Sequence, residues 1–175
     1  MEMFEWYMIR STGLVAYFLL YLSAMTGIYT QIKKSRKQKV ATTNIYHESL
    51  SDWALYLTVG HVGFLLIDKY MGFKWTEVLI PFATDYKTIA NALGIIGLYF
   101  LILAIVTSKA RKKIGYQRWQ KLHALNPILY ILVTLHTLFI GTDIKGYFLA
   151  IVNIIPIVIM GGFLFRNHSE TKVSQ

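Results

Sequence analysis

Five apolar segments of about 20 residues each constrain this chain more than any other feature of its sequence. A helix needs about 20 mainly apolar residues to cross the hydrocarbon core of a bilayer. Hydrophobic residues make up 55% of the chain, and most of them are concentrated in these segments. We therefore predict an all-α integral membrane helical bundle of about five transmembrane helices, forming one domain over residues 1–175. The predicted helices cover residues 13–31, 47–67, 89–108, 122–141 and 146–165.

The basic residues alternate between the two ends of these segments. Thirteen of the 18 lysines and arginines lie in residues 33–39, 109–121 and 166–175, which fall at one end, and five lie at the other. The positive-inside rule places the basic end in the cytoplasm, so we predict an N-terminus outside and a C-terminus inside. The same rule accounts for the net charge of +9. We therefore predict membrane lipid as a partner and no nucleic acid.

The residues before the first apolar segment include two glutamates and a single arginine. A cleaved signal peptide begins with basic residues and ends at a small-residue cleavage site. We therefore expect the first segment to be a retained helix.

Four of the five histidines form two pairs on the second and fourth predicted helices. His61 follows His47 by fourteen positions, and His136 follows His123 by thirteen. At about 1.5 Å per residue, each pair spans about 20 Å of helix. Because the predicted topology makes both helices run from the cytoplasm outward, we expect the imidazoles at two levels. Each level then holds one histidine from each helix.

Two levels of paired imidazoles are typical of a bundle that holds two stacked b-type haems. Neutral imidazole supplies axial ligands to haem iron without burying a charge in the bilayer. The chain has no cysteine, which excludes thiolate metal sites and covalently attached haem, and no carboxylate at membrane depth completes a zinc site. We predict haem b, one or two groups with two favoured, and no catalytic residue. The cofactor-binding and iron-ligating residues are then His47, His61, His123 and His136, hereafter the four helix histidines.

The helical periodicity satisfies this hypothesis on one helix only. Fourteen positions at about 100° each come within about 40° of whole turns, so His47 and His61 share a face. Thirteen positions leave a mismatch of about 140° between His123 and His136. Either Pro127 kinks or rewinds the fourth helix, or His123 lies before the regular helix begins. The sequence leaves both alternatives open.

Several stretches resemble the ferric reductase-like transmembrane domain family. RWQKLH (residues 118–123) is similar to that domain, and its histidine is followed thirteen positions later by another histidine in HTLFIGTD. HESLSDWALYLTVGH (residues 47–61) is similar to it as well. WYMIRSTGLVAY and GFKWTEVLIPFATDYK also look like its short bacterial form. The resemblance implies a haem b bundle like the core of ferric reductases, NADPH oxidases and the haem-binding membrane subunit of the periplasmic methionine sulfoxide reductase system. The fuller family form has six helices, and this chain shows five.

This resemblance implies electron transfer across a bacterial plasma membrane. By position, His47 and His123 would hold the inner haem, and His61 and His136 the outer haem. Electrons would pass from a cytoplasmic or quinol donor to an acceptor outside, such as ferric iron or a partner reductase. No dinucleotide-binding fingerprint is present, so we expect the donor to be a quinol, a free reduced flavin or a cytoplasmic flavin reductase.

Two alternatives to a free-standing reductase stay open. The chain is an oxidoreductase-type electron-transfer subunit that acts only with a partner, such as an extracytoplasmic oxidoreductase, or it is a non-redox small membrane protein, such as a permease or an assembly factor. The sequence does not assign it to an enzyme class.

Overall fold

The computed structural model describes residues 2–141, together with 147–148, 151–153, 156–159 and 162. In this part of the chain every regular element is helical and no strand is present. The predicted all-α class is therefore confirmed. Among the described residues, four helical spans are long and apolar enough to cross a membrane, the last of them Tyr116–Ile140. They correspond to the first four predicted helices. Half of the fifth, over 146–165, falls outside the described residues, and those of its residues that are described are helical.

The elements follow one another along the chain as α1 (Glu2–Ser35), α2 (Ala41–Ile67), α3 (Trp75–Leu79), α4 (Thr88–Lys109), α5 (Arg111–Ile114), α6 (Tyr116–His123) and α7 (Asn126–Ile140).

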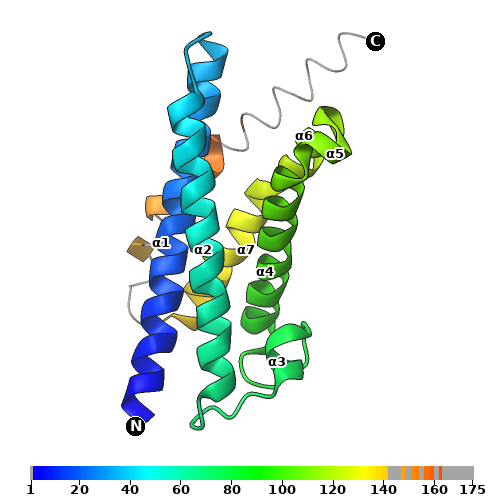
Figure 1. The fold of residues 1–175 in the computed structure, drawn as a ribbon. Helices are drawn as coiled ribbons and strands as arrows, with labels where there is room; N and C mark the ends of the chain where they lie inside the picture. The colour runs from blue at the N-terminus through cyan, green and yellow to red at the C-terminus, as the bar shows by residue number, and fades with distance from the viewer. Residues whose placement is uncertain (1, 142–146, 149–150, 154–155, 160–161, 163–175) are drawn as a thin grey trace.

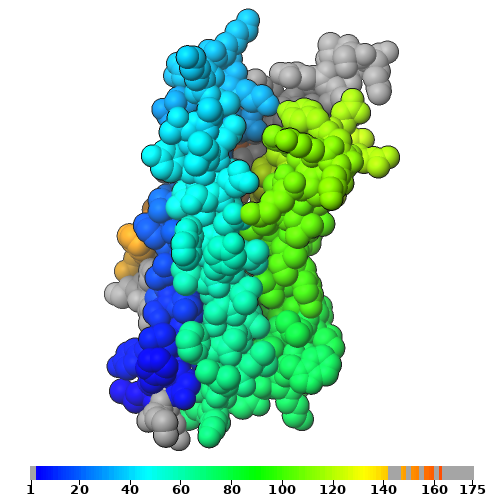
Figure 2. All heavy atoms as spheres, in the orientation of Figure 1, coloured from blue at the N-terminus to red at the C-terminus, as the bar shows by residue number. Residues whose placement is uncertain are grey.

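The long helices form two antiparallel pairs. α1 packs mainly against α2, and α4 packs mainly against α7, while smaller contacts of α1 with α7 and of α2 with α4 join the pairs. Figure 1 shows that α2 and α7 run in the same direction, from the end with α5 and α6 toward the end with α3. In Figure 2 the side chains of α2 and α4 meet along the half of the visible face that includes α3 and separate toward α5 and α6. The shared direction of α2 and α7 is what the two predicted histidine levels require.

The bundle exposes apolar side chains and encloses polar ones. Phe18, Val59 and Val106 are each more than half exposed, as expected of side chains that face lipid. Inside the bundle the Tyr17 hydroxyl lies 3.2 Å from Thr134 Oγ1, joining α1 to α7. Since a bilayer offers no water to such groups, polar side chains must bond to one another, and these bonds hold the helices together.

The first two helices of the structure are longer than the apolar segments that predicted them. α1 begins at Glu2 and ends at Ser35, so it includes the charged residues that precede and follow the segment at 13–31. Lys33 and Lys34 lie in its last turn, where basic side chains interact favourably with the negative end of the helix dipole. α2 begins at Ala41, well before His47. Hydropathy marks the part of a helix that lies in the hydrocarbon core and does not mark its ends.

The predicted fourth helix is divided into two. α6 ends at His123, α7 begins at Asn126, and Pro127 lies in the first turn of α7. Proline has no N–H to donate and has a fixed φ, so it is favoured in a first turn and disfavoured within a helix. The predicted continuous helix over 122–141 was therefore wrong at this point. His123 therefore lies before the regular helix that carries His136, and the change of winding lies next to Pro127, so both alternatives describe this junction.

The segment between α2 and α4 closes one end of the bundle. It contains α3, and Tyr99 on α4 donates its hydroxyl proton to the Leu79 carbonyl at the end of α3. The Lys87 ammonium donates to the carbonyl of Phe139, 3.0 Å away, at the end of α7. Carbonyls in a last helical turn have no partner within their own helix, so this lysine satisfies α7 and fixes the segment against it.

We expect Tyr17→Phe to destabilise the bundle, because it removes the hydroxyl that bonds Thr134. Interhelical hydrogen bonds in membranes contribute about 0.6 kcal/mol on average and about 1.7 kcal/mol at most. The free energy of unfolding in mixed detergent micelles should fall within that range. Tyr46→Phe is the matched control, since Tyr46 is 60% exposed, and it should leave the value unchanged. Equal losses in both variants would contradict a specific contribution from the Tyr17–Thr134 bond.

Candidate functional site

The structure brings the four helix histidines together as two pairs. Because α2 is continuous, His47 and His61 are separated by about 21 Å of regular helix. The rings of His47 and His123 form one level, with centroids 6.0 Å apart and planes at 84°. His61 and His136 form the second level, because each lies near the end of its helix, α2 or α7, and both helices run toward the end with α3. None of these four side chains is fully enclosed.

Three of these imidazoles are bonded to backbone carbonyls of the neighbouring helix. In each case Nδ1 lies 2.8 Å from the carbonyl oxygen. The pairs are His47 with Ser23 on α1, His61 with Ile9 on α1, and His136 with Ala90 on α4.

These carbonyls determine which ring nitrogen carries the proton. A carbonyl oxygen only accepts hydrogen bonds, so Nδ1 must be the N–H of each ring. In the neutral ring Nε2 then carries a free lone pair, and among the described residues nothing donates to Nε2 of His47, His61 or His136. An imidazole that ligates a metal usually donates its other N–H in this manner, which fixes the tautomer and the ring orientation.

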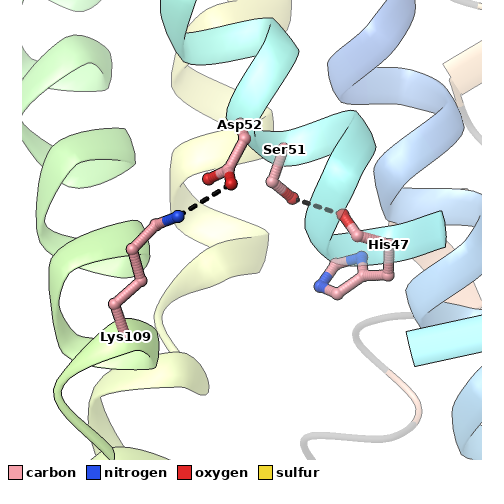
Figure 3. A network of polar contacts seen from close by, with 4 residues as sticks. All are labelled: His47, Ser51, Asp52 and Lys109. Carbon is pink, nitrogen blue, oxygen red and sulfur yellow. Dashed lines mark hydrogen bonds and ion pairs between the residues drawn. The ribbon is translucent and has the colours of Figure 1, made fainter. Parts of the chain in front are cut away.

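His47 lies in a larger polar network between α1 and α2. The Ser23 hydroxyl, 2% exposed, lies 3.0 Å from His47 Nδ1 and 2.7 Å from the Ser51 hydroxyl. Ser51 in turn donates to the carbonyl of His47, 2.8 Å away (Figure 3). The histidine is therefore held through both its side chain and its backbone.

An ion pair lies beside this network. Lys109 Nζ on α4 is 2.7 Å from Asp52 on α2 (Figure 3). Hydropathy did not reveal this pairing, because Asp52 and Lys109 are 57 positions apart in the sequence. The Lys109 side chain is 52% exposed, so solvent screens the pair and it contributes little to stability. Its place between α2 and α4 gives it a role in aligning the two helix pairs.

His123 is held differently from the other three histidines. It ends α6, its ring stacks on Trp119 with centroids 4.9 Å apart, and the amide nitrogen of Asn126 lies 3.2 Å from its Nδ1. Among the described residues no backbone carbonyl accepts from this ring. Trp119 also donates through Nε1 to the Ser108 hydroxyl, 3.1 Å away. Side chains, and not the backbone, therefore orient His123.

A packed core separates the two levels. Ala54, with no exposed surface, lies midway between the two histidines of α2 and belongs to a cluster with Leu20, Leu101 and Leu129. Tyr130, 2% exposed, completes this cluster and donates to Asn153. The interior between the levels is therefore filled with apolar side chains and internally bonded polar groups.

The ligand set at each level is a pair of imidazoles. Among the described residues no three histidine, cysteine or acidic side chains converge on one point, so the predicted set of two protein ligands per level is all that this part of the chain offers. Two metal–imidazole bonds of about 2 Å each and the two ring radii of about 1 Å each add up to about 6 Å. The 6.0 Å between the ring centroids of His47 and His123 is of this size, so the spacing of this level is compatible with one metal ion held by both rings. A metal so bound needs its remaining ligands from a cofactor.

One comparison with known proteins identifies a family for this chain. The family model described as ferric reductase-like transmembrane component matches residues 12–134, which include three of the four helix histidines and end just before His136. Neither the search of curated proteins nor the search of solved structures found a match.

In haem-free protein we expect His61 and His136 to be Nδ1–H tautomers, because their acceptors are backbone carbonyls. Nitrogen-15 NMR of histidine-labelled protein distinguishes a protonated from an unprotonated ring nitrogen. The variants His61→Ala and His136→Ala assign the two signals. An Nε2–H tautomer at either residue would contradict the hydrogen bonds described above.

Proposed function

Since the chain belongs to the ferric reductase-like transmembrane family, we propose that it transfers electrons across a membrane through b-type haem held by the four helix histidines. The family supports a transmembrane redox role, and its domains generally bind haem. The observation that carries the proposal for this chain is the arrangement of its imidazoles. They lie in two pairs, and in three of the four the backbone occupies Nδ1 and leaves Nε2 free.

Two haems suit this arrangement better than one. His47 and His123 would ligate one iron, and His61 and His136 the other, with the levels about 20 Å apart along α2. A haem, when bound, would supply an iron that changes its charge by one, and the protein would hold that iron through two imidazole nitrogens at each level. Neutral imidazoles provide these without placing a permanent charge in the bilayer.

The remaining residues keep the interior dry and rigid. The cluster around Ala54 excludes water between the levels, and the hydroxyl of Tyr17 is bonded within the bundle. Burial in a low-dielectric interior and hydrogen bonds to the axial ligands are the means by which a protein adjusts a haem potential. The chain thus contributes ligation, spacing and a water-free path, and the electron chemistry belongs to the cofactor.

The basic residues suggest the direction of transfer. The α1–α2 turn and α5–α6 lie at the same end of the bundle (Figure 1), and this end carries eleven of the basic residues counted above. By the positive-inside rule it faces the cytoplasm. The His47–His123 level would then receive electrons from a cytoplasmic flavin reductase, a free flavin or a quinol. The His61–His136 level would pass them to ferric iron or an extracytoplasmic oxidoreductase outside a bacterial plasma membrane.

Haem stoichiometry in wild-type protein, His61→Ala and His123→Ala tests this proposal. Wild-type protein, expressed with sufficient haem and purified in detergent, should bind two haems with reducible Soret and α bands. Each variant should lose about half of the haem, and a different half as judged from the α band, because the two histidines serve different levels. His168→Ala, outside the proposed ligand set, is the control and should keep both haems.

Two results would sink the proposal. One is a wild-type protein that shows no reducible haem spectrum, and the other is full haem content after all four helix histidines are changed to alanine. The first outcome would favour a non-redox membrane protein, such as a permease or an assembly factor. The second would mean that residues other than the four helix histidines ligate the haem.

A further inference from the structure

Three of the four histidine rings lie against a glycine of the neighbouring helix. A Cβ atom added at any of these glycines would come closer to the ring than ordinary van der Waals contact, which begins near 3.4 Å. The distances to the nearest ring atom are 3.0 Å for Gly13 and His61, 3.2 Å for Gly27 and His47, and 2.5 Å for Gly94 and His136. Each ring therefore occupies the place that a side chain would take.

Each of these glycines has the same position relative to the carbonyl that accepts from the imidazole. It lies at position i+4 of the same helix when the carbonyl belongs to residue i, and the three pairs are Ile9 and Gly13, Ser23 and Gly27, and Ala90 and Gly94. In an α-helix the N–H of residue i+4 donates to the carbonyl of residue i, and Cβ atoms tilt toward the N-terminus. A side chain at i+4 would therefore crowd this carbonyl on its outer side.

A glycine at i+4 removes this obstruction. The carbonyl oxygen has a second lone pair, which the imidazole N–H can reach without disturbing the helical hydrogen bond. We call each carbonyl and its glycine at i+4 a glycine cradle. The three cradles hold His61, His47 and His136, and in each the ring lies close enough to the helix to bond the backbone.

The spacing of the cradles on α1 matches the spacing of the histidines on α2. Gly27 follows Gly13 by fourteen positions, as His61 follows His47. Because α1 and α2 are antiparallel, Gly13 meets His61 near one end and Gly27 meets His47 near the other. Equal spacing on two paired helices is what two simultaneous contacts of the same kind require.

General helix packing does not account for these three positions. Glycines in membrane helices often allow two helices to approach closely, and Gly97 does so against Val133. Gly60 and Gly63, which flank His61 in the sequence, have nothing within 4 Å of an added Cβ. Among the described glycines, only those of the three cradles lie against an imidazole.

We propose that Gly13, Gly27 and Gly94 are positioning residues for the haem ligands. Each keeps a backbone carbonyl open to one imidazole, and thereby sets the tautomer and orientation of that ring with Nε2 free for iron. The assignment to haem rests on the function proposed above, whereas the cradle itself is a property of the haem-free chain. It follows that Gly27 acts on one haem level, and Gly13 and Gly94 act on the other.

Glycine-to-alanine variants in the full chain test the proposal, with Gly60→Ala and Gly63→Ala as matched controls. Loss of a bond to a ligating histidine typically weakens metal binding about 10- to 100-fold. We expect this fall in haem affinity for Gly94→Ala, a smaller fall for Gly13→Ala and the smallest for Gly27→Ala, in the order of the distances above. Affinity is measured by titration of haem into haem-free protein, and both controls should match the wild type.

Spectroscopy identifies which haem each glycine affects. Gly13→Ala and Gly94→Ala should alter the low-spin EPR signal and raise the midpoint potential of the haem that His61→Ala removes, because an imidazole that no longer donates a hydrogen bond is a weaker base. Gly27→Ala should affect the haem that His123→Ala removes. A general loss of stability would instead affect both haems alike, and that result would overturn the proposal.

Haem-free protein separates this proposal from the proposed function. Nitrogen-15 NMR should show the His136 Nδ1–H signal displaced in Gly94→Ala and unchanged in Gly63→Ala. If wild-type protein binds no haem, the proposed function fails, while this signal still tests the cradle. An unchanged signal, or haem binding by Gly94→Ala equal to that of Gly63→Ala, overturns the positioning role.

A final variant covers the case in which Gly94→Ala does not fold. The double variant Gly94→Ala, His136→Ala removes the ring that the new methyl group would meet. It should fold as well as His136→Ala alone, as judged by circular dichroism and thermal unfolding. If the double variant fails like the single one, the crowding is not with the imidazole and the proposal is wrong.

Discussion

A histidine N–H inside a membrane bundle must find its acceptor within the protein, since the bilayer core contains no water. Three of the four helix histidines meet this requirement with a carbonyl of the adjacent helix. The bond fixes more than the ring, because it also sets the distance between the two helices and their register along the axis. α1 can pair with α2 through two such bonds only if both helices are regular between them. The pairing of helices and the presentation of Nε2 therefore have one physical origin.

The sequence predicted the transmembrane helices better than it predicted their ends. The three apolar segments at 13–31, 47–67 and 89–108 all lie within α1, α2 and α4, because a helix that crosses a bilayer needs an uninterrupted apolar stretch. Hydropathy could not predict that α1 begins as early as Glu2, since a helix that extends into water needs no apolar residues. It also joined α6 and α7 into one helix. The angular mismatch between His123 and His136 was the signal that the helix is interrupted, and Pro127 marked the place.

The pairing of the four helix histidines was predictable from the sequence, whereas the groups that hold their rings were not. Histidine spacing and helix direction were sufficient to predict the two levels, because both follow from helical geometry. The carbonyls that accept from Nδ1 could not be predicted. Every residue has a backbone carbonyl, and the pairing of the helices determines which one meets the imidazole. One signal was present in the sequence: Gly13 and Gly27 have the spacing of His47 and His61.

His123 has no glycine cradle, because the corresponding position on α4 is not a glycine. Thr107 follows Gly94 by the same number of positions that separates His123 from His136. The Thr107 hydroxyl donates to the Leu103 carbonyl, 2.7 Å away, so the outer lone pair of that carbonyl is already used. His123 relies instead on Trp119 and Asn126. One level is thus held by backbone on both sides, and the other by backbone on one side and by side chains on the other.

This difference affects how the two levels respond to sequence change. No substitution removes a backbone carbonyl. The His61–His136 level can therefore be changed only at its glycines, where any other residue adds side-chain atoms next to the imidazole. A level that depends on an indole ring and a carboxamide can be altered by many ordinary substitutions. Variation among descendants of this chain would accumulate at the His47–His123 level, while the other level retained its form. Because the hydrogen-bond partners of the His61–His136 level are backbone carbonyls, selection on them would be visible in related sequences only as conserved glycines at positions 13 and 94.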